Sequence, residues 1–411
     1  MKPGWRFLVL FRALSLLLVA VPLCQAAWDF TAPGDPNRSW SASWSSSAEY
    51  DDNFNSSEFN RQSGYRLNSD LSLRAKAVGE RSLLSGQYDY QTLYPNYNRQ
   101  GGVADTHELN ASMNYSINPR LLLSLNDNFV NSIEPSLVQS QNGTPITLIQ
   151  SGTYIYNNVA AGTSYALTRR WSVSFAGNWD VWSYENSAFA TNNNHEDYSM
   201  TLSLLYGLDS RTVVGVNYQY SGTMYTDPGF KNGLNSDANS GYLSLTRQFN
   251  PKFSLALNGG YTVRNSEDGS TSTGPSAYGA LIYNYGPASS VSLVAAESLN
   301  AASIGVSHSF SAQQNTSISL KVNHRFTARL HTELDASYVY STFTLPLVEQ
   351  TVQTLSPNDQ LLTFHWNMGY DFRQWISAGV NYDYTRVLSS NALLVQPYSR
   401  NQVSATLTLT Y

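Results

Sequence analysis

The sequence predicts an all-β protein, an antiparallel transmembrane β-barrel of 18 strands, with 16 strands as the alternative. Three observations predict it: an alternating C-terminal run, short turns that alternate with long polar connections, and a low charge content. Charged residues make up 13% of the chain, against roughly 25% in typical globular proteins. Aromatic residues also make up 13%, with 28 tyrosines among them. Only every second residue of a barrel strand faces lipid, so this mixture suits strands with an apolar outer face and a wet inner face.

The N-terminus has the pattern of a secretion signal. Lys2, Arg6 and Arg12 supply positive charge before an apolar core, and 24–26 (Cys-Gln-Ala) is an acceptable cleavage site. We therefore expect a signal peptide over residues 1–26, a linker over 27–39 and a barrel over 40–411. The apolar core is too short for a membrane-spanning helix. Cys24, the single cysteine, would leave with the signal, so the mature chain would have no disulfide.

Eight short turns are the clearest landmarks between the expected strands. They contain the proline, glycine, asparagine and aspartate that turn geometry favours. Eight turns join sixteen strands, and one strand at each end brings the number to 18, an even number as in bacterial single-chain barrels. The turns lie near Gly79-Glu80-Arg81, Asn118-Pro119-Arg120, Thr168-Arg169-Arg170, Asp209-Ser210-Arg211, Asn250-Pro251-Lys252, Gly286-Pro287-Ala288, Thr327-Ala328-Arg329 and Arg373-Gln374.

The expected strands alternate residue by residue, which assigns their faces. The run from Phe253 places Leu255 and Leu257 towards lipid, and the runs from Tyr198 and Leu362 follow the same rule. Asp127 and Glu297 fall in the lipid phase of their runs, so either the registers shift or both residues lie at the rim. The last strand follows the rule to its end, and it resembles the closing strand that the outer-membrane insertion machinery recognises. Its outward set is Val403, Ala405, Leu407, Leu409 and Tyr411.

The longer connections are expected to be extracellular and the short turns periplasmic. The segment Pro135–Gly152 is the best candidate for a constriction loop that folds into the pore. The other long connections are Phe54–Gly64, Asn96–Thr106, Asn186–His195, Tyr225–Asn239, Ser266–Gly274, Ala301–Gln314, Leu345–Gln360 and Leu388–Tyr398.

The inward phase of the strands gives a set of candidate lumen-lining residues. Both signs of charge occur in it, which favours paired charges that stiffen the wall over a filter for one sign. The net charge of −5 argues against nucleic acid as a partner. The candidates are Arg66, Asp70, Arg74, Asn178, Asn217, Gln219, Asn258, Arg264, Lys321, Asn323, Arg325, Glu333, Asp335, Asp371, Asn381 and Asp383.

No catalytic, metal or cofactor motif accompanies this pattern. The six histidines are scattered over different strands and loops, and the sequence has neither a nucleophile elbow nor a zinc-binding helix. We therefore expect no enzyme activity, no cofactor and no metal. Glu49, Asp51 and Asp52 could attract calcium, but they lack the spacing of a calcium loop. Solvated rim charges that contact lipopolysaccharide cations are the favoured interpretation.

The segment 49–54 (Glu-Tyr-Asp-Asp-Asn-Phe) and the turns at 118–120 and 250–252 carry a resemblance to a known family. They resemble motifs of the outer-membrane β-barrel porins encoded in exopolysaccharide biosynthesis operons. The resemblance implies a channel for a secreted polysaccharide in the bacterial outer membrane. The partners that it implies are the polysaccharide and a polysaccharide-export lipoprotein. The barrel pattern, the acidic rim residues and the C-terminal strand separately predict membrane lipid, lipopolysaccharide and the insertion machinery as partners. The alternatives are a general or sugar diffusion porin and a non-conducting structural or adhesive barrel.

Overall fold

The computed structural model describes most of the chain from residue 39 onward. The described residues are 39–95, 104–132, 137–139, 145–147, 153–185, 194–226, 235–301, 312–344, 358–390 and 397–411. The expected signal peptide and nearly all of the linker lie outside them and stay predictions. Most of Pro135–Gly152 also lies outside them. That this segment constricts the pore therefore stays a prediction.

The described chain is built from β-strands. Each of the long strands has between 12 and 16 residues, enough to cross the apolar band of an outer membrane when tilted. The strands are β1 (Trp40–Asp51), β2 (Gly64–Val78), β3 (Ser82–Pro95), β4 (Ala104–Asn118), β5 (Leu121–Ser132), β6 (Leu137–Gln139), β7 (Pro145–Thr147), β8 (Tyr154–Ala166), β9 (Trp171–Tyr184), β10 (His195–Gly207), β11 (Thr212–Tyr225), β12 (Ser236–Asn250), β13 (Phe253–Ser266), β14 (Thr271–Gly286), β15 (Ser289–Asn300), β16 (Ala312–Arg325), β17 (Leu330–Thr344), β18 (Asn358–Arg373), β19 (Ile376–Ser389) and β20 (Tyr398–Thr410).

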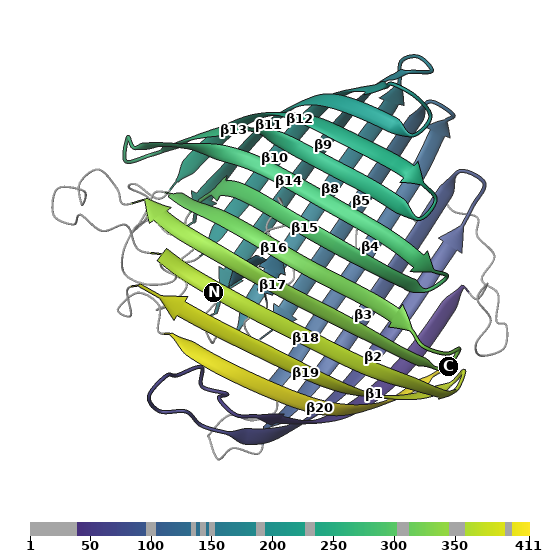
Figure 1. Ribbon diagram of the computed structural model, residues 1–411, viewed down its shortest axis with the longest axis vertical. Helices are drawn as coiled ribbons and strands as arrows, with labels where there is room; N and C mark the ends of the chain where they lie inside the picture. The colour runs from purple at the N-terminus through teal and green to yellow at the C-terminus, as the bar shows by residue number, and fades with distance from the viewer. Residues whose placement is uncertain are drawn as a thin grey trace.

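The sheet closes on itself. Sequential long strands pair antiparallel, and β1 pairs with both β2 and β20. The closed sheet has 18 strands within the described residues, as Figure 1 shows. The 18-strand prediction is therefore confirmed and the 16-strand alternative is wrong. The two short strands β6 and β7 pair only with each other in the described part of the chain.

All eight predicted turns lie where the structure has its short connections. They join β2–β3, β4–β5, β8–β9, β10–β11, β12–β13, β14–β15, β16–β17 and β18–β19. The start of β1 and the end of β20 lie at the same end of the barrel as these turns. We call this end the turn end and the opposite one the loop end.

Several predicted loops are shorter than expected; for example, β12 begins at Ser236, inside the segment Tyr225–Asn239. The segment Ser266–Gly274 was predicted as a long connection, but β13 continues to Ser266 and β14 begins at Thr271. Gly269 makes the tight connection with a φ of +83°, a conformation that glycine adopts at no steric cost. The strand start at 271–274 is hidden in the sequence because its residues are Thr, Ser, Thr and Gly, which show no apolar face.

The outer wall of the barrel is apolar and exposed. Leu243 has 65% of its surface exposed, Val216 61% and Leu202 53%. The outward residues predicted for the runs from Tyr198, Phe253 and Leu362 lie on this wall, because paired residues of neighbouring strands share a face. In water such a wall would be strongly unfavourable. A hydrocarbon environment removes that cost.

Asp127 and Glu297 are on the outer face without a register shift. Asp127 pairs with Ala111 and Val159, midway along β5 rather than at the rim. It is 8% exposed and its Oδ1 accepts a 2.7 Å hydrogen bond from the Asn157 amide. Glu297 accepts a 3.2 Å bond from Gln314. For Asp127 neither expected explanation holds, since a local amide partner accommodates the carboxylate.

The seam between β1 and β20 is fastened by the acidic segment 51–53. Asp51, 2% exposed, accepts hydrogen bonds from Nε and Nη2 of Arg400 at 2.8 and 2.5 Å. Asp52 accepts the backbone N–H and the amide of Asn401 at 2.7 and 2.6 Å, and Asn53 donates to the Ser399 carbonyl at 2.8 Å. The interpretation of Glu49 and Asp51 as solvated rim charges is wrong, because both are buried in β1 and paired across strands.

Candidate functional site

A continuous polar surface inside the barrel lies on the inward face of β3, β4, β5, β8 and β9. Inward positions alternate with the lipid-facing ones, and the cross-strand register lines them up from strand to strand. We call this surface the amide wall. Its members are Gln87, Asp89, Glu108, Asn110, Asn126, Asn128, Asn158, Asn178 and Asp180.

The carboxylates of the amide wall are hydrogen-bonded by amides. Glu108 accepts bonds from Asn110 and Asn128 at 2.7 and 3.3 Å. Asp180 accepts bonds from Asn158 and Asn178 at 2.5 and 2.7 Å. The Tyr156 hydroxyl also donates to Asp180, at 2.9 Å. The wall therefore presents many neutral donors and acceptors, and its charges are held by dipoles.

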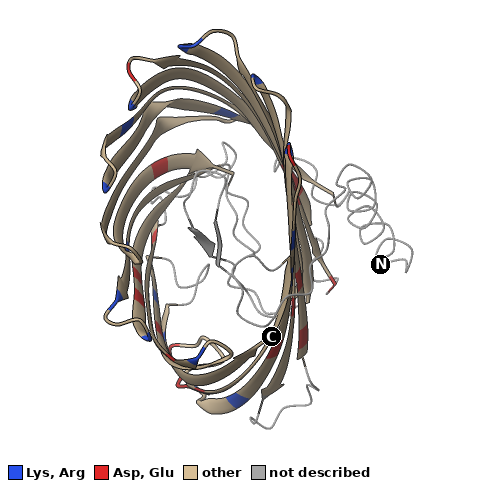
Figure 2. Ribbon diagram, turned by 90° about the vertical axis from the view of Figure 1, so that its right-hand side faces the viewer, with Lys and Arg blue, Asp and Glu red and all other residues tan. Residues whose placement is uncertain are grey.

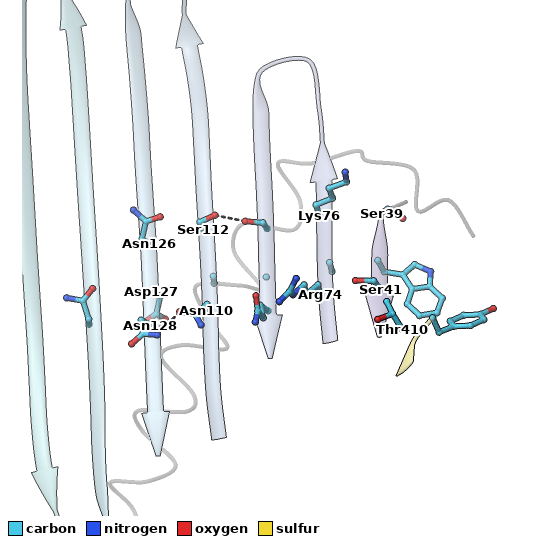
Figure 3. Close-up of a pocket in the computed structure, with 18 residues that line it drawn as sticks. Ser39, Ser41, Arg74, Lys76, Asn110, Ser112, Asn126, Asp127, Asn128 and Thr410 are labelled. Carbon is cyan, nitrogen blue, oxygen red and sulfur yellow. Dashed lines mark hydrogen bonds between the residues drawn. The ribbon is translucent and has the colours of Figure 1, made fainter. Parts of the chain in front are cut away.

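A hollow of about 610 Å³ lies along this wall towards the turn end. Arg74 and Lys76 of β2 border it on one side, and Asn110 of β4 and Asn126 and Asn128 of β5 lie beyond β3 (Figure 3). Amides, hydroxyls and two cations in one concave surface can bind a polar solute from several sides.

The wall formed by β16 to β19 carries ion pairs and a further amide pair. Lys321 pairs with Glu333, the Nδ1 of His365 lies 2.6 Å from Asp383, and Asn367 donates to Asn381. The side chains of Lys321 and Glu333 are 46% and 38% exposed. These charges therefore line space rather than fill a core.

The predicted lumen-lining residues all occupy inward positions of the register, but they do not form one site. Glu49 forms a 2.9 Å ion pair with Arg66 at the seam. Arg264 is 5% exposed and donates to Ser236 at 2.6 Å. The inward positions are Arg66, Asp70 and Arg74 on β2, Asn178 on β9, Asn217 and Gln219 on β11, Asn258 and Arg264 on β13, Lys321, Asn323 and Arg325 on β16, Glu333 and Asp335 on β17, Asp371 on β18, and Asn381 and Asp383 on β19.

The balance of charge differs from the one read in the sequence. On the inward faces of the described strands, carboxylates outnumber arginines and lysines. The predicted lumen-lining set did not contain Glu108 and Asp180 of the amide wall, nor Asn110, Asn128 and Asn158. Every second residue from 106 to 114 is polar, and this alternation could have predicted the first part of the wall.

The described residues contain neither a membrane-spanning helix nor a metal-binding cluster. No helix among them is long and apolar enough to cross a membrane. No group of three or more histidine, cysteine or acidic residues in the described ranges is arranged to hold a metal ion.

No protein-family model matches the chain, and no curated protein matches its sequence. Among solved structures, OccAB4 of Acinetobacter baumannii is 10% identical over 92% of this chain and 100% of its own, with a TM-score of 0.45. OpdQ of Pseudomonas aeruginosa is 12% identical over 90% and 98%, with a TM-score of 0.42. A bacterial polysaccharide outer membrane secretin is 8% identical over 90% and 98%, with a TM-score of 0.35. These likenesses are too distant to carry a conclusion about function.

The structure itself identifies the chain as a membrane protein. A closed antiparallel barrel of even strand number leaves no unpaired sheet edge, and its exposed wall is apolar. Closed barrels with these properties span the outer membrane, with short turns on the periplasmic side and longer loops outside. The chain is an integral β-barrel protein of the bacterial outer membrane.

Proposed function

We propose that the chain is an outer-membrane channel for saccharides, specialised for the passage of a secreted polysaccharide. The amide wall carries the proposal. Asn110, Asn128 and Asn158 lie in register on neighbouring strands and bond to carboxylates beside them. A sugar chain can exchange hydrogen bonds along such a surface without one deep binding site. Barrels of 16–18 strands have room for an aqueous channel.

A neutral saccharide fits this lumen better than a polyanion. Carboxylates such as Glu108 and Asp180 outnumber cations on the inward faces of the described strands. The segment 51–53, which supports the resemblance to exopolysaccharide porins, makes the seam contacts. It therefore adds nothing on the identity of the cargo.

The test is single-channel conductance of the refolded protein in a planar bilayer, with neutral gluco-oligosaccharides or oligogalacturonates added. We expect open channels that the neutral chains block for longer. The triple variant Asn110→Ala/Asn128→Ala/Asn158→Ala should shorten the blocking events. A matched control on the opposite wall, Ser337→Ala/Thr363→Ala/Thr385→Ala, should leave them unchanged.

The outcomes separate the alternatives. Open channels that no oligosaccharide blocks would favour the alternative function of a general diffusion porin. A correctly folded barrel without conductance would contradict passive passage and favour a structural or adhesive role.

A further inference from the structure

Six of the eight short turns carry a positive charge at one fixed position. In these six the residue directly before the outgoing strand is arginine or lysine, and all six are exposed. We call these six residues the basic ring: Arg81, Arg120, Arg170, Arg211, Lys252 and Arg329. Figure 2 views the barrel from the side on which the C-terminus lies in Figure 1, and it shows Lys and Arg segments at the tips of turns around the rim.

The turn itself does not need these side chains. In five turns a side-chain oxygen two residues earlier accepts the backbone N–H of the ring residue, as Asn118 does for Arg120 and Asn250 for Lys252, both at 2.9 Å. The ring residue's carbonyl accepts a backbone N–H from the next hairpin, for example Ala166 to Arg120 at 2.8 Å. Any residue except proline supplies these backbone groups. The recurring charge therefore has another cause.

Two ring arginines, Arg170 and Arg211, contact aromatic residues of the outer wall at the turn end. The Arg170 guanidinium donates to the hydroxyl of Tyr206 at 3.3 Å, and Tyr206 packs on Trp171 with ring centroids 4.6 Å apart. Tyr206 and Trp171 belong to the outward set of their strands. Arg211 donates to the carbonyl of Phe249 at 3.2 Å, and the Phe249 side chain is 40% exposed.

We propose that the basic ring binds the anionic phospholipid headgroups of the periplasmic leaflet. The turn end faces the periplasm in an outer-membrane barrel, and cations beside exposed aromatic residues are the pattern of an interface with lipid headgroups. A solute in the pore would be met by inward-facing cations. A protein partner would need only a local patch of charge to bind, whereas the ring occupies six turns around the circumference. Lipid phosphates surround the whole barrel and match that distribution.

The acids of the same turns do not cancel the ring. Glu80 and Asp209 are the acids beside it in the described turns. The Asp209 carboxylate accepts the backbone N–H of Arg211 at 2.7 Å, which lowers its pKa. The lowered pKa keeps Asp209 ionised, so the two acids offset only two of the six ring cations and a clear excess of positive charge remains.

The test compares brominated phosphatidylglycerol with brominated phosphatidylcholine as quenchers of tryptophan fluorescence. The full chain is refolded into phosphatidylcholine vesicles that contain one or the other. Trp171 and Trp375, 42% and 50% exposed at the turn end, are suitable reporters. We expect phosphatidylglycerol to be preferred severalfold, and the preference to fall with added salt because exposed charges are screened.

Two double variants of equal charge decide whether the ring is responsible. Arg120→Gln/Lys252→Gln should reduce the preference, and neutralising all six ring residues should abolish it. The control Arg61→Gln/Arg386→Gln removes two exposed cations at the loop end and should leave the preference unchanged. Heat-modifiable migration in gels verifies that each barrel is folded. A wild-type protein without preference, or a folded six-residue variant that retains it, would overturn the proposal. Capture of an acidic periplasmic protein by a ring without lipid preference would do the same.

Discussion

Asp51 shows how one side chain can hold a barrel closed. Its side chain is 3% exposed and its partner Arg400 is 21% exposed. Removing one partner of such a pair leaves a buried charge uncompensated, at a cost of about 3 kcal/mol. Asp51→Ala should therefore lower the temperature at which the barrel unfolds, measured as the loss of heat-modifiable migration. Glu333→Gln breaks the half-exposed Lys321 pair and should cost less than about 1 kcal/mol. Equal losses for the two variants would contradict the seam assignment.

For Asp127 we predict the opposite effect, a gain of stability when the carboxylate is removed, because it faces lipid midway along its strand. Charged groups on the lipid face are destabilising near the membrane centre. The double substitution Asp127→Leu/Asn157→Leu removes the carboxylate together with the amide that serves it. We expect it to raise the free energy of unfolding in urea by about 1 kcal/mol. Asn131→Leu, nearer the loop end of the same strand, should change it little. A loss of stability would show that the polar pair is favourable in place.

The turns are the elements in which local chemistry is most regular. The Thr327 hydroxyl accepts the backbone N–H groups of Arg329 and Leu330 at 3.2 and 2.9 Å. Thr168 does the same for Arg170 and Trp171. Thr327→Val removes both bonds and should cost about 1 kcal/mol of unfolding free energy. Ala328→Ser, in the middle of the same turn, is the control and should be neutral. An unchanged unfolding midpoint for Thr327→Val would mean that the strands alone define the turn.

Local patterns predicted the strands and turns because their causes are local. A turn such as 118–120 is marked by its own asparagine and proline, and alternation fixes the outward face of β13 and β18. The start of β14 escaped because its polar residues resemble a loop. The site was harder to predict, since its contacts join distant residues. In the amide wall, Asn128 and Glu108 are 20 positions apart, and Asn158 and Asp180 are 22 apart. At the seam, Asp51 and Arg400 are 349 positions apart. The periodicity of a single strand cannot pair such residues.

At the scale of the molecule, the inward faces and the turn end carry opposite charge. Inward carboxylates outnumber cations on the described strands, while the basic ring lies outside the lumen. An aqueous channel with this lining and low-dielectric walls concentrates cations. We therefore expect potassium to permeate severalfold better than chloride, measured as the reversal potential across a potassium chloride gradient. Asp335→Asn/Asp371→Asn should reduce the ratio, since both residues occupy inward positions. Glu58→Gln, exposed at the loop end, should not. Neutralising the basic ring should also leave the ratio unchanged, because the ring lies in the turns beyond the strands and Arg170 and Arg211 contact the outer wall. An anion-selective channel would contradict this assignment of charge to the lumen.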